Sequence, residues 1–479
     1  MDLSENRRKL KHLYSRAGFG AYITDIKEAE GQGVTYAVDR IFKDSFDYSE
    51  IKINHGAADI KNYRAERKNM SKEERQKLLK VSRQNIAKLN TTWIEKMAFD
   101  NSQLRERMTF FWHDHFACRN ILSVYNQNQN NTLRRHALGS FREMVHAIAK
   151  DPAMIFFLNN LQNKKQSYNE NFARELLELF TIGIGNYTED DIKNAARAFT
   201  GWSIDLDGNY KFRRVQHDFG TKKFMGKSGD FNGDDIIDII LDDKRTAVHI
   251  TSKIYSYFVN ENIHMDKVNQ LAEGFYNTDY DISALMKSIF TSDWFYNKEN
   301  IASRVKSPVD LLAGIMRQFK VKFKNHLAMI GIQRALGQIV FNPPNVGGWV
   351  SGKKWIDSSS IMFRMKLPEI IFKSSDIEFD FKDEPLEDMT GEFQMEMSAA
   401  DKRLYRQVKT SIDLTGYYNE FSNTDNEKLI NGIAGFIIAP EINEKHRTLV
   451  YKYCDSSSTE NMIESSILNL ISLPEYQMC

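Results

Sequence analysis

The chain has 479 residues, and its 65 Lys and Arg side chains nearly balance its 64 Asp and Glu side chains. The net charge of +1 gives no overall field that would attract nucleic acid or an anionic membrane, although a local basic surface stays open. The sequence contains no stretch of about 18 apolar residues, the length that a transmembrane helix needs. We therefore predict no nucleic-acid partner and no membrane partner.

Cysteine usage and the first residues both bear on the compartment. The three cysteines, Cys118, Cys454 and Cys479, are an odd number and show no C-x-x-C spacing. This pattern argues against a disulfide framework and against a zinc site built from cysteines. The opening segment MDLSENRRKLKHLYSRAGFG is charged and lacks the apolar run of a signal peptide. The sequence therefore predicts a cytoplasmic protein.

Helices are predicted for most of the first part of the chain. Residues 70–119 contain no Pro or Gly and carry apolar residues at helical spacing, which predicts two long helices. A second block runs from about 130 to 150 and ends before a proline, because the residue preceding a proline disfavours helical geometry. The segment NENFARELLELF, residues 169–180, predicts a third helix. Thr188, followed by Asp191, nearly reproduces a capping box at the start of a fourth.

The middle of the chain departs from this helical pattern. Residues 207–229 begin with a turn dipeptide, alternate aromatic with basic residues and contain several glycines, which predicts a small β-hairpin and an ordered loop. Helices are expected to resume over residues 234–260, 279–290, 308–319 and 325–339. The acidic segment 374–402 predicts an irregular, exposed insertion.

These elements predict a mainly α fold. Residues 1–479 would form one large helical domain or two closely packed halves, with a small β-hairpin insert near residues 207–229. An arrangement in two halves would place the boundary near residues 203–230.

Several long motifs give the chain a resemblance to a known family. They are HLYSRAGFG at 12–20, ERMTFFWHDHFA at 106–117, RRHALGSFREMVHAIAKDPAMIFFL at 134–158, NENFARELLELFTIGIGNYTEDDIKNAARAFTGW at 169–202, HDFGTKKFMG at 217–226, VKSPVDLLAG at 305–314 and FNPPNVGGWVSGKKWI at 341–356. In this order they resemble a bacterial family catalogued as domain of unknown function 1800. The resemblance implies a helical protein without an established activity, whose members often neighbour a second uncharacterised family of exported, sulfatase-like proteins.

The histidines His113 and His115 in FFWHDHFA are the first candidate polar site. On an uninterrupted helix the two imidazoles would point about 200° apart and could not share a metal ion. If the helix instead ended near Trp112, an extended H-x-H would place both on one side. Packed, hydrogen-bonded imidazoles are the alternative to metal ligands in either geometry, because metal sites usually need three or four ligands.

Two carboxylates form the second candidate site. On a helix, Glu175 and Glu178 share the polar face with Asn171 and Arg174. A solvated stripe with an Arg174 to Glu178 pair is one interpretation. If the carboxylates faced inward, they would need a partner or a metal ion, since an isolated buried carboxylate is costly. In that arrangement Glu175 and Glu178 would be ligands or catalytic bases, and Asn171 and Arg174 would line the pocket.

The loop HDFGTKKFMG supplies further polar chemistry. His217 beside Asp218, with Lys222 nearby, is suited to a metal ligand with its orienting partner, a general base or an anion-binding corner. Charges exposed on a hairpin are the alternative. The motif FNPPNVGGW is stiffened by two prolines, so Asn345 and Trp349 either line a pocket or pack a lid onto the helices.

Two function hypotheses follow from these patterns. The first is a metal-dependent enzyme, hydrolytic or mononuclear oxidative, in which His113, His115 and His217 bind zinc, iron or manganese. Glu175, Glu178 and Asp218 would then serve in catalysis. The second is a non-catalytic binding or maturation partner of a neighbouring exported sulfatase-like protein, which the family resemblance implies.

Two cations stand in segments that are otherwise apolar or turn-like. They are Arg16 in YSRAGFG and Lys306 in VKSP. A cation withdrawn from water needs a counter-charge, so we expect at least one of them to pair with a carboxylate. The alternative is a long side chain that reaches back to the surface.

Overall fold

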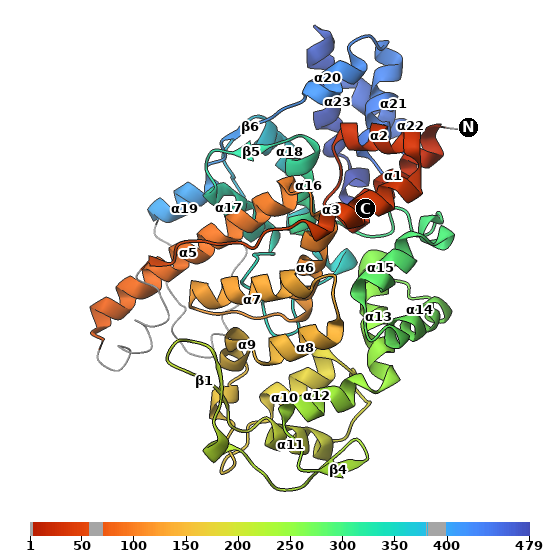
Figure 1. The fold of residues 1–479 in the computed structure, drawn as a ribbon. Coiled ribbons are helices and arrows are strands. Elements are labelled where there is room, and N and C mark those ends of the chain that lie inside the picture. The colour runs from red at the N-terminus through yellow and green to blue at the C-terminus, as the bar shows by residue number, and fades with distance from the viewer. Residues whose placement is uncertain (1–2, 57–69, 380, 382–398) are drawn as a thin grey trace.

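The structure of the protein is a computed structural model that describes residues 3–56, 70–379, 381 and 399–479 (Figure 1). Helices dominate these residues, and the named strands form three two-stranded antiparallel sheets. The predicted mainly α fold is confirmed. Most of the predicted acidic insertion at 374–402 lies outside the described residues.

The helices match the predicted segments and divide some of them further. Up to the first hairpin they are α1 (Leu3–Ala17), α2 (Ile23–Gln32), α3 (Val34–Phe46), α5 (Lys72–Phe99), α6 (Gln103–His115), α7 (Ser123–His136), α8 (Phe141–Ala149), α9 (Pro152–Phe157), α10 (Asn171–Glu175) and α11 (Glu189–Ala198). After the hairpins follow α12 (Gly233–Leu241), α13 (Lys244–Phe258), α14 (Met265–Asn277), α15 (Ile282–Phe290), α16 (Pro308–Gln318), α17 (Leu327–Leu336), α18 (Ser358–Phe372), α19 (Ala399–Arg406), α20 (Thr415–Phe421), α21 (Asn426–Ile437), α22 (Glu444–Lys452) and α23 (Thr459–Ile471).

Side-chain caps explain where several of these helices begin. The capping box predicted for α11 is present, because Asp191 N donates to Thr188 Oγ1 over 3.1 Å and Thr188 N donates to Asp191 Oδ2 over 2.9 Å. Asp151 caps α9 by accepting a hydrogen bond from Ala153 N at 2.8 Å. The helix that was expected to end before Pro152 does so, and the proline then occupies the first turn of the next one.

The strands are short and form hairpins rather than a layer. They are β1 (Trp202–Ile204), β2 (Tyr210–Phe212), β3 (Lys222–Phe224), β4 (Lys227–Gly229), β5 (Lys322–Phe323) and β6 (Thr410–Ser411). The predicted insert at 207–229 is therefore two hairpins, β1 with β2 and β3 with β4, and the first begins earlier than expected. The β5 to β6 pair was not predicted, because two-residue strands carry no alternating pattern.

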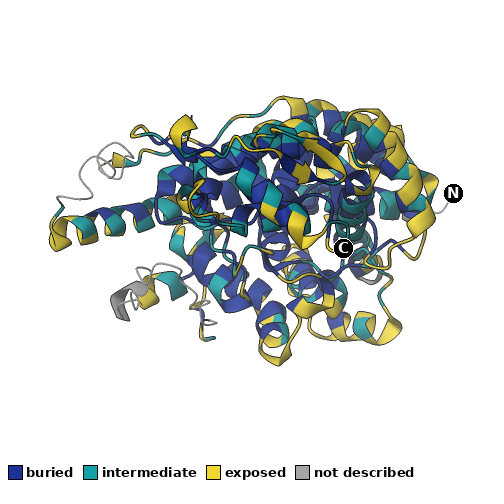
Figure 2. Cartoon of the chain, turned by 90° about the horizontal axis from the view of Figure 1, so that it is seen from below, coloured by how far each residue is buried: buried dark blue, intermediate teal, exposed yellow. Residues whose placement is uncertain are grey.

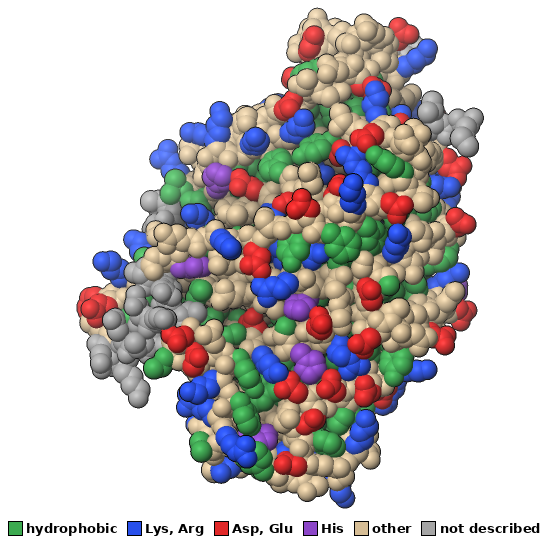
Figure 3. Space-filling model, in the orientation of Figure 1, with side chains coloured by type: hydrophobic (Ala, Val, Ile, Leu, Met, Phe, Trp, Pro, Cys, Tyr) green, Lys and Arg blue, Asp and Glu red, His purple; other side chains and the backbone are tan. Residues whose placement is uncertain are grey.

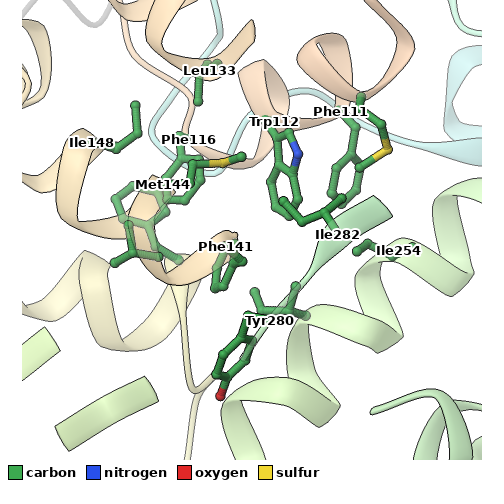
Figure 4. Packing of buried hydrophobic residues seen from close by; sticks show 14 of the residues in the cluster. Phe111, Trp112, Phe116, Leu133, Phe141, Met144, Ile148, Ile254, Tyr280 and Ile282 are labelled. Atoms are coloured by element: carbon green, nitrogen blue, oxygen red, sulfur yellow. The ribbon is translucent and has the colours of Figure 1, made fainter. Parts of the chain in front are cut away.

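Two hydrophobic cores organise the helices. The first core is centred on Trp112, Phe141 and Tyr280, and Figure 4 shows its aromatic side chains packed together between helices. The Trp112 and Phe141 rings are stacked with centroids 5.3 Å apart. The second core contains Trp93 of α5 and most of the buried apolar residues from α16 onward, such as Phe319. In Figure 2 the buried residues fill the interior and the exposed ones lie at the rim.

Helix α6 runs along the boundary between the two cores. Its Met108 and Trp112 belong to the first core, whereas Phe110 belongs to the second. Every residue of α6 except Asp114 is buried, including its charged side chains. Buried charges must be paired, and Glu106 accordingly accepts a hydrogen bond from Arg134 Nε at 2.8 Å.

Candidate anion-binding pocket

Helix α6 continues through His115, so the H-x-H pair has helical and not extended geometry. His113 faces the second core, where its Nε2 accepts a hydrogen bond from Phe341 N at 3.1 Å and its ring lies 5.0 Å from Trp93. His115 faces the first core and donates from Nε2 to the Phe180 carbonyl oxygen at 3.0 Å. Burial lowers the pKa of His113 to about 3 and the pKa of His115 well below its ordinary value. The two imidazoles are neutral, and they point away from each other.

Asp114, between the two histidines, anchors the loop at 341–350. Its Oδ1 accepts a hydrogen bond from Trp349 N at 2.8 Å. Gly348 has a φ of +81°, and a Cβ there would collide with the same oxygen, so only glycine fits this close approach. Trp349 packs 5.6 Å from the His113 ring, while the exposed Asn345 accepts a hydrogen bond from Gly347 N within its own turn. The loop is thus a lid packed on α6, which was one of its two predicted roles.

Lys253 of α13 adds a third polar group beside Asp114 and His115. Its Nζ donates to the Leu179 carbonyl oxygen at 2.8 Å and lies 3.3 Å from His115 Nδ1. Burial lowers the pKa of Lys253 to about 8 and raises the pKa of Asp114 to about 6. Sequence reasoning overlooked Asp114, although it stands between the two histidines that it considered. None of these groups lines the pocket described below.

The carboxylates Glu175 and Glu178 lie on a partly exposed face. Glu178 follows α10 in the π-helical turn η3 (Leu176–Phe180) and pairs with Arg174 at 3.4 Å. Arg174 also pairs with Glu189 of α11 at 2.8 Å. Burial and the neighbouring Glu178 raise the pKa of Glu175. Asn171, the first residue of α10, is on the same partly exposed turn. Of the two interpretations of this face, the solvated stripe therefore agrees with the structure.

The hairpin residues satisfy one another locally. His217 is buried, and its Nδ1 donates to the Thr200 carbonyl oxygen at 2.8 Å. Asp218 accepts a hydrogen bond from Arg197 Nε at 2.8 Å; burial acts to raise its pKa, but this bond holds the pKa well below its ordinary value. Lys222 is buried and donates from Nζ to the Asp218 carbonyl oxygen at 2.6 Å. These contacts fasten the hairpins to the end of α11.

The predicted metal ligands are not brought together. Within the described ranges, no three or more His, Cys, Asp or Glu side chains form a group that could hold a metal ion. His115 bonds the backbone of Phe180, two residues after Glu178. His217 instead bonds Thr200, just after the end of α11. A zinc, iron or manganese cofactor therefore stays a prediction without a ligand group to support it.

A pocket lies instead where two of the family-like motifs meet, at 12–20 and 305–314. Residues of α1, α6, α16 and α21 line it, together with Met478 and Cys479 at the C-terminal end of the chain. Its cavity volume of about 40 Å³ has room for about three water molecules or a small ion. Its lining residues are Lys11, Tyr14, Ser15, Gly18, Phe19, Gly20, Ala21, Ile26, Arg107, Lys306, Asp310, Gly314, Gln318, Phe436, Ile437, Ala439, Met478 and Cys479.

Asp310 is the acidic side chain among these lining residues, and it is already paired. Arg107 of α6 forms an ion pair with it, and Arg304 Nη2 lies 3.6 Å from its Oδ2. Burial acts to raise the pKa of Asp310, but Arg107 and Arg304 hold the pKa at about 2. Arg107 is 1% exposed, and its Nε has no hydrogen-bond partner among the described residues. Arg107 therefore still has a free hydrogen-bond donor, its Nε. The two arginines together carry more positive charge than the single carboxylate of Asp310 neutralises.

Two lysines line the same pocket. The Lys306 ammonium lies 3.5 Å from the centre of the Tyr476 ring, and no carboxylate of the described residues lies within ion-pair distance of it. Burial lowers the pKa of Lys306 to about 8. The Lys11 ammonium donates to the Ile438 carbonyl oxygen, and burial, then repulsion by Arg7, lowers the pKa of Lys11 to about 7. Attraction to Cys479 and Asp310 opposes the shift of Lys306, and attraction to Glu30 opposes that of Lys11, but burial outweighs both.

Arg16 and Arg364 add positive charge around this wall. Arg16 is fully buried and donates to Ser303 Oγ at 3.0 Å, but its Nε and Nη1 have no partner in the described part of the chain. Burial lowers the pKa of Arg16 to about 10, and attraction to Cys479 opposes this shift. Burial likewise lowers the pKa of Arg364 to about 10.

The prediction that at least one of the two singled-out cations pairs with a carboxylate is wrong. Arg16 is fully buried and Lys306 is half-buried, but neither forms an ion pair with a described carboxylate. The carboxylate of Asp310, whose charge acts on both cations, forms its ion pair with Arg107 instead. Sequence reasoning missed Arg107, Asp310 and Lys11 because nothing in their local patterns distinguishes them from surface charges.

Comparison with known proteins gives a family and no close relative of known activity. No curated protein matches the chain, and no solved structure matches it. Within the described ranges, no helix is both long enough and apolar enough to span a bilayer. The model of the family described as "Protein of unknown function (DUF1800)" matches residues 12–478, which include both motifs that build the pocket. Because this match covers nearly the whole sequence, the chain belongs to that family.

Proposed function

We propose that this protein is a non-catalytic binder that holds a small anionic group, a carboxylate, phosphate or sulfate, in the pocket between α1 and α16. The carrying observation is that Arg107 and Lys306 line the pocket while the Arg107 Nε and the Lys306 ammonium lack an acceptor among the described residues. A buried donor without an acceptor, such as Arg107 Nε, is costly, and an anion in the pocket would relieve that cost.

The lining also limits the chemistry of the ligand. Arg107 offers a planar fork that suits an oxyanion, and Lys306 offers a compact point charge. The cavity volume of about 40 Å³ suits the anionic group itself and not a large ligand. Phe19, Phe436 and Ile437 make part of the wall apolar.

The two function hypotheses make different demands on the structure. A metal-dependent enzyme needs ligands that the described residues do not bring together, whereas a non-catalytic binder needs only a pocket of suitable charge. The pocket therefore supports the binding half of the second hypothesis. Partnership with an exported sulfatase-like protein stays a prediction, since no contact or charge at this pocket bears on it.

Isothermal titration calorimetry with sulfate, phosphate and acetate, at an ionic strength held constant with chloride, tests this function. Wild type should bind at least one of these anions, and Lys306→Met should lose most of that affinity. Lys298→Met is the matched control, because Lys298 is exposed and is not among the lining residues. Thermal melts of the same proteins should show a ligand-dependent rise in Tm that Lys306→Met lacks.

The comparison between variants separates specific binding from general salt effects. Sulfate and phosphate stabilise most proteins by exclusion from their surface, and that contribution is the same in all three proteins. Equal affinities for wild type and Lys306→Met would rule out the pocket as the binding site. Absence of binding by wild type to all three anions would rule out the proposed function.

A further inference from the structure

An exposed apolar surface lies on the hairpin end of the molecule, remote in sequence from the pocket. Tyr168, Phe212, Val215 and Phe219 are 48%, 39%, 78% and 47% exposed, respectively. We call these four side chains the Phe212 patch. Single exposed apolar residues are normal, but four that are gathered on one local structure require an explanation.

Hydrogen bonds and ring contacts hold the Phe212 patch together. The buried His217 ring lies 5.1 Å from Phe212 and 4.7 Å from Phe219, so both phenyl rings pack on the same imidazole. Tyr168 donates from its hydroxyl to Asp218 Oδ2 at 2.8 Å, which fixes it beside the same loop. The patch is therefore one ordered surface and not a set of independent loop residues.

Cations interleave with these apolar side chains. The exposed residues Lys211, Arg213 and Arg214 flank Phe212 and Val215, and the Arg214 guanidinium lies 5.0 Å from the Phe219 ring centre. Lys164 and Lys165 are exposed on the neighbouring loop, where Lys165 N donates to the Gln216 carbonyl oxygen at 2.9 Å. In Figure 3 the lower end of the molecule, where Figure 1 places the hairpins, carries Lys and Arg beside exposed hydrophobic side chains.

The positive charge of this surface is not neutralised locally. Among the residues that the structure describes, none of these five cations has a carboxylate within ion-pair distance. The carboxylate of Asp218, inside the patch, is instead paired with Arg197 at 2.8 Å. The surface therefore offers four apolar side chains and five free positive charges to a partner, even though the whole chain has a net charge of only +1.

We propose that the Phe212 patch and its flanking cations dock the protein on an anionic lipid surface. Loops with apolar side chains at their tips and Lys or Arg around them bind at the boundary between headgroups and acyl chains. Val215, the most exposed of the four, is aliphatic and would be left in water by a nucleic acid, which recognises aromatic faces and cations. Protein interfaces deplete Lys at their centre, whereas here the cations alternate with the apolar residues.

Co-sedimentation with vesicles tests this surface in the full chain. Wild type should sediment with vesicles that contain phosphatidylserine and phosphatidylcholine, and should stay in solution with phosphatidylcholine alone. Val215→Glu should abolish sedimentation. Ile184→Glu is the matched control, because Ile184 is an equally exposed aliphatic residue, 76% exposed, on a different loop outside the Phe212 patch. Since both substitutions replace exposed side chains, both variants should fold, and far-UV circular dichroism checks this.

A second pair of variants tests the charges. The double substitution Arg213→Gln and Arg214→Gln should weaken sedimentation at least tenfold in vesicle concentration, while Lys298→Gln should not change it. Rising salt should release the wild type. The proposal is overturned if wild type ignores both kinds of vesicle, if Val215→Glu and Ile184→Glu behave alike, or if single-stranded DNA or poly-glutamate binds the patch while vesicles do not.

Discussion

Trp349 donates its backbone N–H to Asp114 Oδ1 over 2.8 Å, which joins the end of α6 to a loop 235 residues further along the chain. The contact closes the loop at 341–350 over the His113 ring. Asp114 therefore links the N-terminal and C-terminal parts of the sequence by a hydrogen bond. Its substitution should affect the loop before it affects the helices.

Asp114→Ala should loosen this loop. The substitution leaves the Trp349 N–H without its acceptor, which costs about 1 to 3 kcal/mol when the group stays buried. Hydrogen–deuterium exchange should rise over residues 341–350 and remain unchanged over α13. Asp114→Asn keeps an acceptor oxygen and should behave like wild type; equal exchange in Asp114→Ala would show that the loop is held by packing alone.

The buried pair of Arg107 and Asp310 should be far more sensitive than a surface pair. Arg107→Met or Asp310→Asn leaves one buried charge unpaired and should cost about 3 to 5 kcal/mol in urea unfolding. The double variant should cost less than the sum of the two. Lys287→Ala, which breaks an exposed pair with Asp39, should cost about 0 to 1 kcal/mol. Additive losses in the double variant would contradict a direct interaction.

Asp151 should make the protein less stable as the pH rises. Burial raises the pKa of this helix-capping carboxyl to about 7. A folded pKa above the unfolded value means that its stabilising effect is complete below about pH 4 and is lost as the pH rises through about 7. Asp151→Asn does not titrate, so at pH 8 it should exceed wild type by on the order of 1 to 3 kcal/mol.

The capping residue Asp243 of α13 provides the opposite control. Its hydrogen bond from Arg245 lowers the pKa of Asp243, so its carboxylate stabilises the fold above the unfolded pKa. Asp243→Asn should therefore lose a little stability at pH 8 and none in acid. Thermal melts of both variants between pH 4 and pH 8 measure this, and the same sign for both would refute the assignment of Asp151.

Anion affinity at the pocket should fall in mildly alkaline solution. The pKa of Lys306 is about 8 and that of Lys11 about 7 because both are buried, and a bound anion would raise both. Above pH 8, affinity should then drop about tenfold per pH unit for each of the two lysines that contacts the anion. Calorimetry in two buffers of different ionisation enthalpy should register proton uptake near pH 8. Unchanged affinity at pH 9 would mean that neither lysine contacts the anion.

His113 and Glu175 should respond differently to substitution. His113→Ala removes the acceptor of Phe341 N and the ring beside Trp93, which should cost about 1 to 3 kcal/mol. Glu175→Gln removes a carboxylate whose pKa is raised by burial and by Glu178, so Tm should stay equal or rise. Melts with and without zinc, iron or manganese check both. A metal-dependent rise in wild type that His113→Ala abolishes would restore the metal hypothesis.

Local patterns in the sequence located most helices, because the relevant interactions span only a few residues. Thr188 with Asp191 and the proline after Asp151 are examples in which the signal and its effect lie in the same turn. The course of α6 beyond Trp112 was left open, since it depends on where His115 packs. The contact of His115 with Phe180 supports the last turn of the helix, and no local pattern contains that contact.

The pocket was beyond sequence reasoning for the same physical reason. Its ion pair joins Arg107 to Asp310 across 203 residues, and no periodicity relates the two positions. Arg16 and Lys306 could be noticed as cations in apolar or turn-like segments, but Asp310 forms its ion pair with Arg107 and not with them. The predicted metal ligands are separated for the same reason, because His113, His115 and His217 bond Phe341, Phe180 and Thr200, respectively. The carboxylates of Asp218 and Glu178 pair with arginines.

The alternation of the chain between its two cores determines how the molecule can be divided. Leu13 of α1 belongs to the first core and Phe19, just after that helix, to the second. A fragment ending near residue 230 would keep Trp93 of α5 but lack α16 and the later helices that supply the rest of the second core, so this side chain would face water. Truncation should therefore yield aggregation and not a smaller stable unit. The intact chain should melt in one cooperative transition, although its length would ordinarily accommodate several independent domains.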